Sequence, residues 1–199
     1  MLYFSSQLNL QKHKPAADRM FAALNSFNIK YKLLNNTKDI WLRDFMPVKT
    51  KSGKYVSFRY EPSYLANNPQ LRTNFKTDIA PSFKVDNLVY TDINLDGGNV
   101  VFSPSKEKVI ISDRVYSENP SWHKAELTAK LAKLLEANVI IIPSLKSDMT
   151  GHADGMVRLV GENTAIVNAP LSPYGFEAKV KKSLQNYGFN VIDFPYFYS

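Results

Sequence analysis

The sequence of 199 residues is 44% hydrophobic, enough for the core of one globular domain, and its lack of cysteine excludes disulfide bonds, cysteine-held zinc and a thiol nucleophile within these residues. No apolar stretch approaches the roughly 18 residues of a membrane span, and residues 1–7 lack the features of a secretory signal, so we expect a cytoplasmic protein without membrane contact. The net charge of +7 raises the question of a nucleic-acid partner, but the basic residues are scattered and no base-stacking pattern accompanies them, so we expect none.

Three segments of the chain predict a helix followed by a strand. Apolar residues at helical spacing indicate helices over about 14–27, 121–136 and 175–187. Each is followed by a short run typical of a strand, at 29–34, 139–142 and 190–194. The segment 61–86, which contains several Asn and Pro residues, predicts a loop with a short helix.

Between these elements a hairpin pattern recurs, introduced each time by an acidic residue. Asp44 precedes strands at 45–49 and 55–58, Asp96 precedes strands at 97–103 and 109–112, and Asp154 precedes strands at 155–160 and 164–168. The acids lie 52 and then 58 residues apart, which indicates related units arranged around an axis.

We therefore expect one α/β domain with repeat units at about 1–60, 61–115, 116–170 and 171–199. The same period places a fourth acidic or catalytic position near residue 210, so the sequence is expected to end within a repeat. The alternative is that residues 194–199 form the terminal strand of a small α/β domain.

The loops before the three hairpins should lie at one end of the core if the units are related by rotation. This arrangement would bring Asp44, Asp96, His152 and Asp154 around one pocket. A cluster of carboxylates suits a cationic substrate, and a planar guanidinium fits best because each carboxylate can accept two of its N–H groups.

His152 lies two residues before Asp154, so both side chains would point the same way on an extended segment. Carboxylates favour the charged form of a histidine, which can then donate and accept a proton near neutral pH. The alternative is a buried or helix-capping His152 with Asp154 as a turn acid. We interpret His13 and His123, which have no acidic companion, as surface residues.

Three other interpretations concern the same segments. One histidine with several carboxylates can hold a divalent metal ion, but a single histidine makes this signal weak. Trp41, between Asp39 and Asp44, can instead be a core residue beside a capped turn. The pair at 97–98 is a weak signal for phosphate binding because no helix pattern follows it.

Three segments, in order, resemble motifs of the agmatine deiminase and bacterial peptidyl-arginine deiminase family. Residues 41–47 resemble the W-x-R-D-x-x-P segment of that family, residues 95–99 its acidic G-G-N segment, and residues 151–158 its G-H-x-D-G-x-x-R segment. The resemblance implies the pentein fold, a five-bladed α/β propeller. The chain would form about three blades and the start of a fourth.

The resemblance also implies a reaction without metal or other cofactor. In that family a cysteine thiolate attacks the guanidinium carbon, ammonia leaves, and water hydrolyses the covalent intermediate to a ureido product. Asp44 and Asp154 would bind the guanidinium nitrogens, and His152 would protonate the leaving ammonia and activate water. Asp96 would bond substrate or orient His152, and Trp41 would form a wall of the pocket.

Three further residues of these segments, Arg43, Gly98 and Asn99, are expected to contact substrate. The cysteine of the family lies in a later glycine-rich segment that this sequence does not contain, and no Ser or Thr is marked as its replacement. We therefore expect the chain alone to be inactive.

The full-length form would hydrolyse agmatine to N-carbamoylputrescine and ammonia, or peptidyl-arginine to citrulline. The alternative is a non-catalytic pseudoenzyme or partner subunit that binds guanidinium cations. A third interpretation is a metal-dependent hydrolase or an unrelated binding domain. The open end of an incomplete propeller predicts association with the missing C-terminal part or with a second copy.

Overall fold

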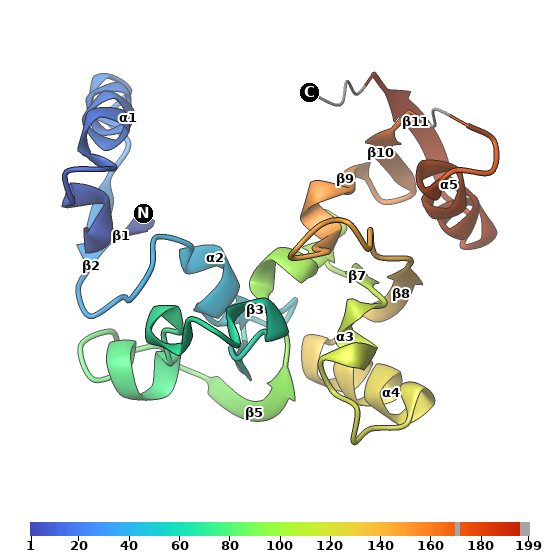
Figure 1. Ribbon diagram of the computed structural model, residues 1–199, viewed down its shortest axis with the longest axis horizontal. Helices are drawn as coiled ribbons and strands as arrows, with labels where there is room; N and C mark the ends of the chain where they lie inside the picture. Colours follow the sequence, from blue (N-terminus) through green and yellow to red (C-terminus); the bar gives the residue numbers. More distant parts are fainter. Residues whose placement is uncertain (170–171, 196–199) are drawn as a thin grey trace.

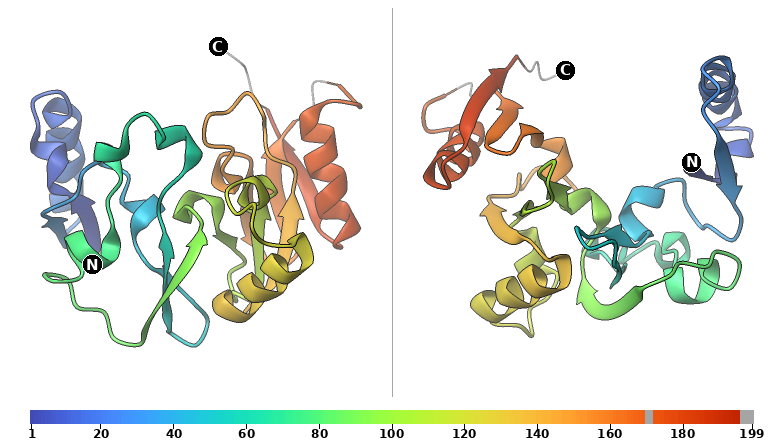
Figure 2. Two further views of the ribbon diagram at one scale, coloured as in Figure 1. Left: turned by 60° about the horizontal axis from the view of Figure 1, so that its bottom comes forward. Right: turned by 180° about the vertical axis from the view of Figure 1, so that it is seen from behind.

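The computed structural model describes residues 1–169 and 172–195. They form one two-stranded and three three-stranded sheets. These sheets follow one another around an arc that is open between the first and the last of them (Figure 1). The three longer helices lie on the outer side of the arc (Figure 2). Among the described residues, no helix has the length and apolar character needed to cross a membrane.

The three-stranded sheets share one topology. A first strand pairs antiparallel with the second, and the second pairs in parallel with a third that is reached by a longer connection. The sheets consist of β3 (Val48–Lys49), β4 (Tyr55–Arg59) and β5 (Leu88–Asn94), of β6 (Val101–Phe102), β7 (Lys108–Ser112) and β8 (Asn138–Ile142), and of β9 (Val157–Gly161), β10 (Thr164–Asn168) and β11 (Asn190–Phe194).

Within the described part of the chain, the two-stranded sheet at the N-terminal end has only the parallel pair of this pattern and no antiparallel hairpin. β1 (Leu2–Ser5) leads through α1 (Lys14–Ser26) to β2 (Tyr31–Leu34), which pairs with β1 in parallel. The rings of Phe21 on α1 and Tyr31 on β2 stack with centroids 4.7 Å apart, which joins the helix to the strands. The helix predicted at 14–27 and the strand predicted at 29–34 are thereby confirmed, each with slightly shorter bounds.

Two helices cover the later sheets. α4 (Lys124–Leu135) buries Leu127, Leu131 and Leu135, which are spaced four residues apart and therefore lie on one face. α5 (Phe176–Asn186) buries Val180 and Leu184 in the same way. Burial of each such side chain contributes about 1.5–3 kcal/mol to the free energy of unfolding. The helices predicted at 121–136 and 175–187, with the strands after them, are confirmed.

Strand β7 separates two hydrophobic cores. Ile110 packs into the core beneath α5, whereas Val109 and Ile111 pack into the core beneath α4. Alternate side chains of a strand point to opposite faces, so one strand serves both cores. Adjacent units are therefore held together by a shared strand.

The first strands of the predicted hairpins are shorter than expected, because a helical turn takes up the residues next to each acid. The turn α2 (Leu42–Phe45) contains Asp44, and the 3-10 turns η5 (Gly97–Asn99) and η6 (Ala153–Gly155) precede β6 and β9. The strands predicted at 45–49, 97–103 and 155–160 are accordingly wrong at their starts. The return strands are confirmed.

The segment between β4 and β5 contains three short helical turns, η2 (Ser63–Leu65), η3 (Pro69–Leu71) and η4 (Phe75–Ile79). Strand β5 follows this segment and was not predicted. The preceding turns have no helical periodicity, so the helix-then-strand pattern that reveals β8 and β11 is missing here.

The division of the chain into units at 1–60, 61–115, 116–170 and 171–199 stays a prediction. The three-stranded sheets suggest unit boundaries, since each sheet groups a hairpin with the strand that follows it. The sheets extend over residues 48–94, 101–142 and 157–194. Residues 170, 171 and 196–199 lie outside the described residues, and with them most of the alternative terminal strand at 194–199.

Candidate active site

Three helical turns, one before the first strand of each three-stranded sheet, place the candidate side chains. Asp44 lies in α2, Asp96 immediately precedes η5, and His152 immediately precedes η6. Because each turn occupies the same position in its unit, the three side chains meet although they lie more than 50 residues apart in sequence. Figure 1 shows α2 near the middle of the arc.

The imidazole of His152 lies between two carboxylates. Its Nε2 is 2.7 Å from Oδ2 of Asp96, and its Nδ1 is 3.8 Å from Oδ1 of Asp44. The side chains of His152, Asp96 and Asp44 are 10%, 9% and 13% exposed. A carboxylate accepts hydrogen bonds, so the short contact has His152 donating its Nε2 proton to Asp96.

Gly98 allows the close approach of these groups. Its backbone N–H donates to Oδ1 of Asp44 over 2.9 Å. A Cβ at this position would collide with Nδ1 of His152 and lie 2.7 Å from Oδ1 of Asp44. A Cβ at Gly97 would overlap the carbonyl of Arg43. Glycine is needed at both positions because backbone and side chains of two turns meet there.

Arg43 and Asn99 tie the turns together. Arg43 donates from Nε to the carbonyl of Gly97 over 2.9 Å and from Nη2 to the carbonyl of Val100 over 2.7 Å. The side-chain oxygen of Asn99 accepts from the backbone N–H of Ser112 over 2.8 Å and of Ala153 over 3.2 Å. In the structure these polar groups hold α2, η5, β7 and η6 in place. The expected contact of Arg43, Gly98 and Asn99 with substrate stays a prediction.

Tyr64 is a member of the cluster that the sequence motifs do not contain. Its hydroxyl donates to Oδ2 of Asp96 over 3.0 Å, and its ring meets the ring of His152 edge-on with centroids 6.2 Å apart. The hydroxyl of Tyr60 lies 3.4 Å from that of Tyr64. Both tyrosines lie just after β4, where the only signal was two aromatic residues spaced four apart.

Burial and neighbouring charges shift the proton affinities of the cluster. Burial raises the pKa of Asp44 to about 6, although the positive charge of His152 and the bond from Gly98 oppose this. Burial alone would lower the pKa of His152, but the hydrogen bond to Asp96 and the charges of Asp44, Asp96 and Asp154 outweigh it and raise that pKa. The carboxylates around His152 therefore favour the charged form of its ring.

Asp154 and Trp41 lie at the edge of this cluster. Asp154 is half-buried in η6, close enough for its charge to raise the pKa of both Asp44 and His152. It lies in a turn, so the prediction of an extended segment from His152 to Asp154 is wrong. Trp41 precedes α2 and is 60% exposed, which contradicts the alternative of a core residue.

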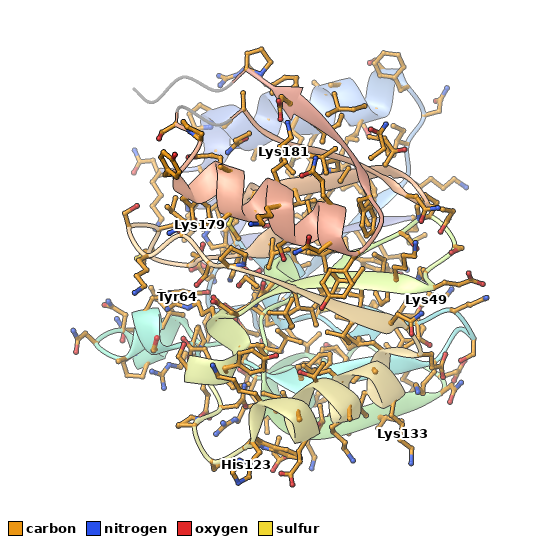
Figure 3. The ribbon with its side chains drawn as sticks, turned by 90° about the vertical axis from the view of Figure 1, so that its right-hand side faces the viewer. Lys49, Tyr64, His123, Lys133, Lys179 and Lys181 are labelled. Carbon is orange, nitrogen blue, oxygen red and sulfur yellow. The ribbon has the colours of Figure 1, made fainter. Side chains whose placement is uncertain are left out.

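The other two histidines lie outside the cluster. His13 precedes α1 and His123 precedes α4. Figure 3 shows His123 at the outer end of α4, well apart from Tyr64. Within the described ranges, no three His, Asp or Glu side chains are arranged to hold a metal ion.

Comparison with known proteins supports both the fold and the family. The sequence matches the family described as Porphyromonas-type peptidyl-arginine deiminase over residues 6–186. None of the curated proteins matches it.

Among solved structures, the chain resembles an agmatine deiminase of C. jejuni with a TM-score of 0.71 and 18% identity, covering 98% of this chain and 70% of that one. For a putative arginine deiminase from Porphyromonas gingivalis the TM-score is 0.64 and the identity 14%, with coverage of 86% and 60%. For DDAH from Pseudomonas aeruginosa the TM-score is 0.51 and the identity 9%, with coverage of 92% of this chain and 82% of that one.

The predicted pentein-type α/β fold is thereby confirmed. The family match covers most of the chain and includes all three turns that carry Asp44, Asp96 and His152. The chain belongs to the Porphyromonas-type peptidyl-arginine deiminase family.

Proposed function

We propose that Asp44, Asp96, His152 and Asp154 form the guanidinium-binding and proton-transfer part of a deiminase site. The observation that carries this proposal is the buried imidazole of His152, held 2.7 Å from one carboxylate and 3.8 Å from another. Such a site attracts a cation and offers it a proton donor. In support, one structure of the C. jejuni enzyme is a cysteine-to-serine variant with substrate bound, and the DDAH structure is a complex with citrulline.

In this proposal Asp44 and Asp154 accept N–H bonds from a guanidinium, which fixes its plane against the wall formed by Trp41. A thiolate adds to the guanidinium carbon. The C–N bond to one terminal nitrogen then breaks, and His152 gives that nitrogen the proton with which it leaves as ammonia. Water then adds to the same carbon and passes a proton to His152. The C–S bond breaks last and the added oxygen gives its remaining proton to solvent, which releases the thiolate and a neutral ureido product.

Asp96 has the geometry of an orienting group in this scheme. It accepts the Nε2 proton of His152 and so leaves Nδ1 directed toward Asp44, where we place the reacting nitrogen. The sequence contains no cysteine, so the thiolate must come from outside these 199 residues. No metal or other cofactor is needed for the reaction as written.

The substrate we propose for the complete enzyme is agmatine or a peptidyl-arginine side chain. The second candidate is a non-catalytic pseudoenzyme or partner subunit that binds guanidinium cations, and the lack of cysteine in these 199 residues is the observation that favours it. In the first case the thiol would lie in the C-terminal part of the full-length form, and in the second the chain would complement a polypeptide that carries it. We propose that the protein has no nucleic-acid or membrane partner. We also propose a cytoplasmic location.

Calorimetry with agmatine tests the guanidinium site. Wild-type protein should bind agmatine and should bind putrescine, which lacks the guanidinium, at least tenfold more weakly, about 1.4 kcal/mol. Asp44→Asn and Asp154→Asn should each weaken agmatine binding by a similar factor. Asp92→Asn removes the same charge from an exposed position on β5 and should bind as wild type does. Equal binding of agmatine and putrescine, or unchanged binding by both site variants, would contradict the proposal.

A further inference from the structure

Tyr64 lies outside the three motif segments, yet its hydroxyl reaches the centre of the site. Oδ2 of Asp96 accepts a hydrogen bond from Tyr64 over 3.0 Å and lies 2.7 Å from Nε2 of His152. A phenol and an imidazole therefore share one carboxylate oxygen. We infer that Tyr64 is a positioning residue, which sets the tautomer and the proton affinity of His152 through Asp96. The inference rests on the proposed function only for what His152 does with its proton.

The neighbouring residue Ser63 and the side chain of Arg114 hold Tyr64 in place. The hydroxyl of Ser63 donates to Oε1 of Glu118 over 2.6 Å, and its backbone N–H donates to Oε2 of the same residue over 3.0 Å. Arg114 donates to the Ser63 hydroxyl over 3.0 Å, and its guanidinium lies 5.7 Å from the centre of the Tyr64 ring. These contacts fasten η2 to α3 (Arg114–Ser117) and the residue after it. Figure 3 shows Tyr64 on the segment between β4 and β5.

The hydroxyl of Tyr64 is a permanent donor. Burial, reinforced by the charge of Asp96, raises the pKa of Tyr64 well above its usual value, so the phenol keeps its proton near neutral pH. Asp96 must then act as an acceptor toward both partners. Neutral His152 accordingly carries its proton on Nε2, and Nδ1 is the atom that exchanges a proton with substrate.

The expected direction of the effect follows from the shared oxygen. While Tyr64 donates a hydrogen bond to Oδ2 of Asp96, that oxygen is a weaker acceptor toward His152. Asp96 then stabilises the imidazolium of His152 less. Removing the hydroxyl should therefore raise the pKa of His152 further. The other groups whose charge acts on His152 stay in place when only this hydroxyl is lost: Asp44 in α2, Asp96 before η5, Asp154 in η6, and Asp148 in the loop before η6, with Arg114 behind the Tyr64 ring.

A titration followed by the nuclear magnetic resonance of isotope-labelled histidine tests this inference. Tyr64→Phe should raise the pKa of His152 by about half a unit, with the neutral ring protonated on Nε2 in wild type. Tyr60→Phe is the matched control, because its hydroxyl lies 3.4 Å from that of Tyr64 and contacts no carboxylate in the described structure. It should leave the pKa of His152 unchanged. His13 and His123 serve as references in every spectrum.

An unchanged or lowered pKa in Tyr64→Phe, or equal shifts in both variants, would overturn the inference. If Tyr64→Phe does not fold, wild-type protein with labelled tyrosine gives the answer. The Tyr64 signal should then titrate with the same midpoint as His152, and a Tyr64 signal that ignores this midpoint would overturn the inference too. These titrations need no substrate, so they separate this inference from the proposed function: failure of agmatine to bind refutes the function and leaves the Tyr64 result standing.

Discussion

Replacing Asp44 with Asn should make the protein more stable at neutral pH while it damages the site. The side chain of Asp44 is only 13% exposed between His152 and the turn at Gly98, and its pKa is raised from 3.8 to about 6. An acid with a raised pKa in the folded state disfavours folding once it is ionised. Asn keeps an oxygen that can accept the N–H of Gly98. The substitution therefore removes the buried charge and retains the hydrogen bond.

The size of this effect follows from the pKa. The shift is about 2 units, which at 1.36 kcal/mol per unit is about 3 kcal/mol. As pH rises past 3.8 the unfolded chain loses this proton first, so the free energy of unfolding of the wild type falls between pH 3.8 and about 6 and this contribution is constant above. Asp44→Asn should therefore gain about 3 kcal/mol near pH 7, but only about 1 kcal/mol near pH 4.5.

Urea unfolding at the two pH values, followed by the fluorescence of Trp41 and Trp122, measures these differences. Trp122 packs against the core beneath α4, so its emission reports the loss of that core. Asp92→Asn, an exposed carboxylate on β5, is the control and should change stability by no more than about 0.5 kcal/mol. An Asp44→Asn protein no more stable than wild type near pH 7, or a gain equally large near pH 4.5, would refute the assignment of a destabilising buried charge.

Three other outcomes follow from the same contacts. Gly98→Ala should cost about 1–3 kcal/mol and abolish agmatine binding in calorimetry, because its methyl group collides with His152, whereas Gly155→Ala meets nothing within 4 Å and should change neither. Agmatine affinity should fall about tenfold from pH 7 to pH 5 as Asp44 takes up a proton, and a flat pH profile would exclude Asp44 from the cation site. Leu131→Ala should lower the free energy of unfolding, measured in urea, by about 2–5 kcal/mol, because Leu131 is a fully buried residue of α4.

The sequence predicted the meeting of Asp44, Asp96 and His152 because a repeat carries information about space. Once three hairpins are recognised as copies, the residues before them must lie at equivalent places around the axis. Helix α4 and strand β8 were predictable for a local reason, since their buried side chains follow regular spacings.

Tyr64 was not predictable in this way. It reaches Asp96 from an irregular segment, and the contact joins residues 32 apart with no periodic pattern between them. The use of Arg43 was equally hidden, because its acceptors are backbone carbonyls of residues 97 and 100, which any sequence provides. Motif membership marks such a residue as part of the site without showing which of its atoms is already bonded.

The architecture of the site shows how the fold tolerates a cluster that opposes its own stability. The carboxylate of Asp44, largely withdrawn from solvent, disfavours the folded state near neutral pH once it is ionised. The N–H of Gly98 restrains Asp44, and the carboxylate of Asp96 restrains His152. The larger apolar cores lie beneath α4 and α5, in the two sheets that follow, and their burial supplies the opposing free energy. Each three-stranded sheet is thus preceded by one turn of the site, and the apolar burial in these sheets offsets the cost of the polar cluster.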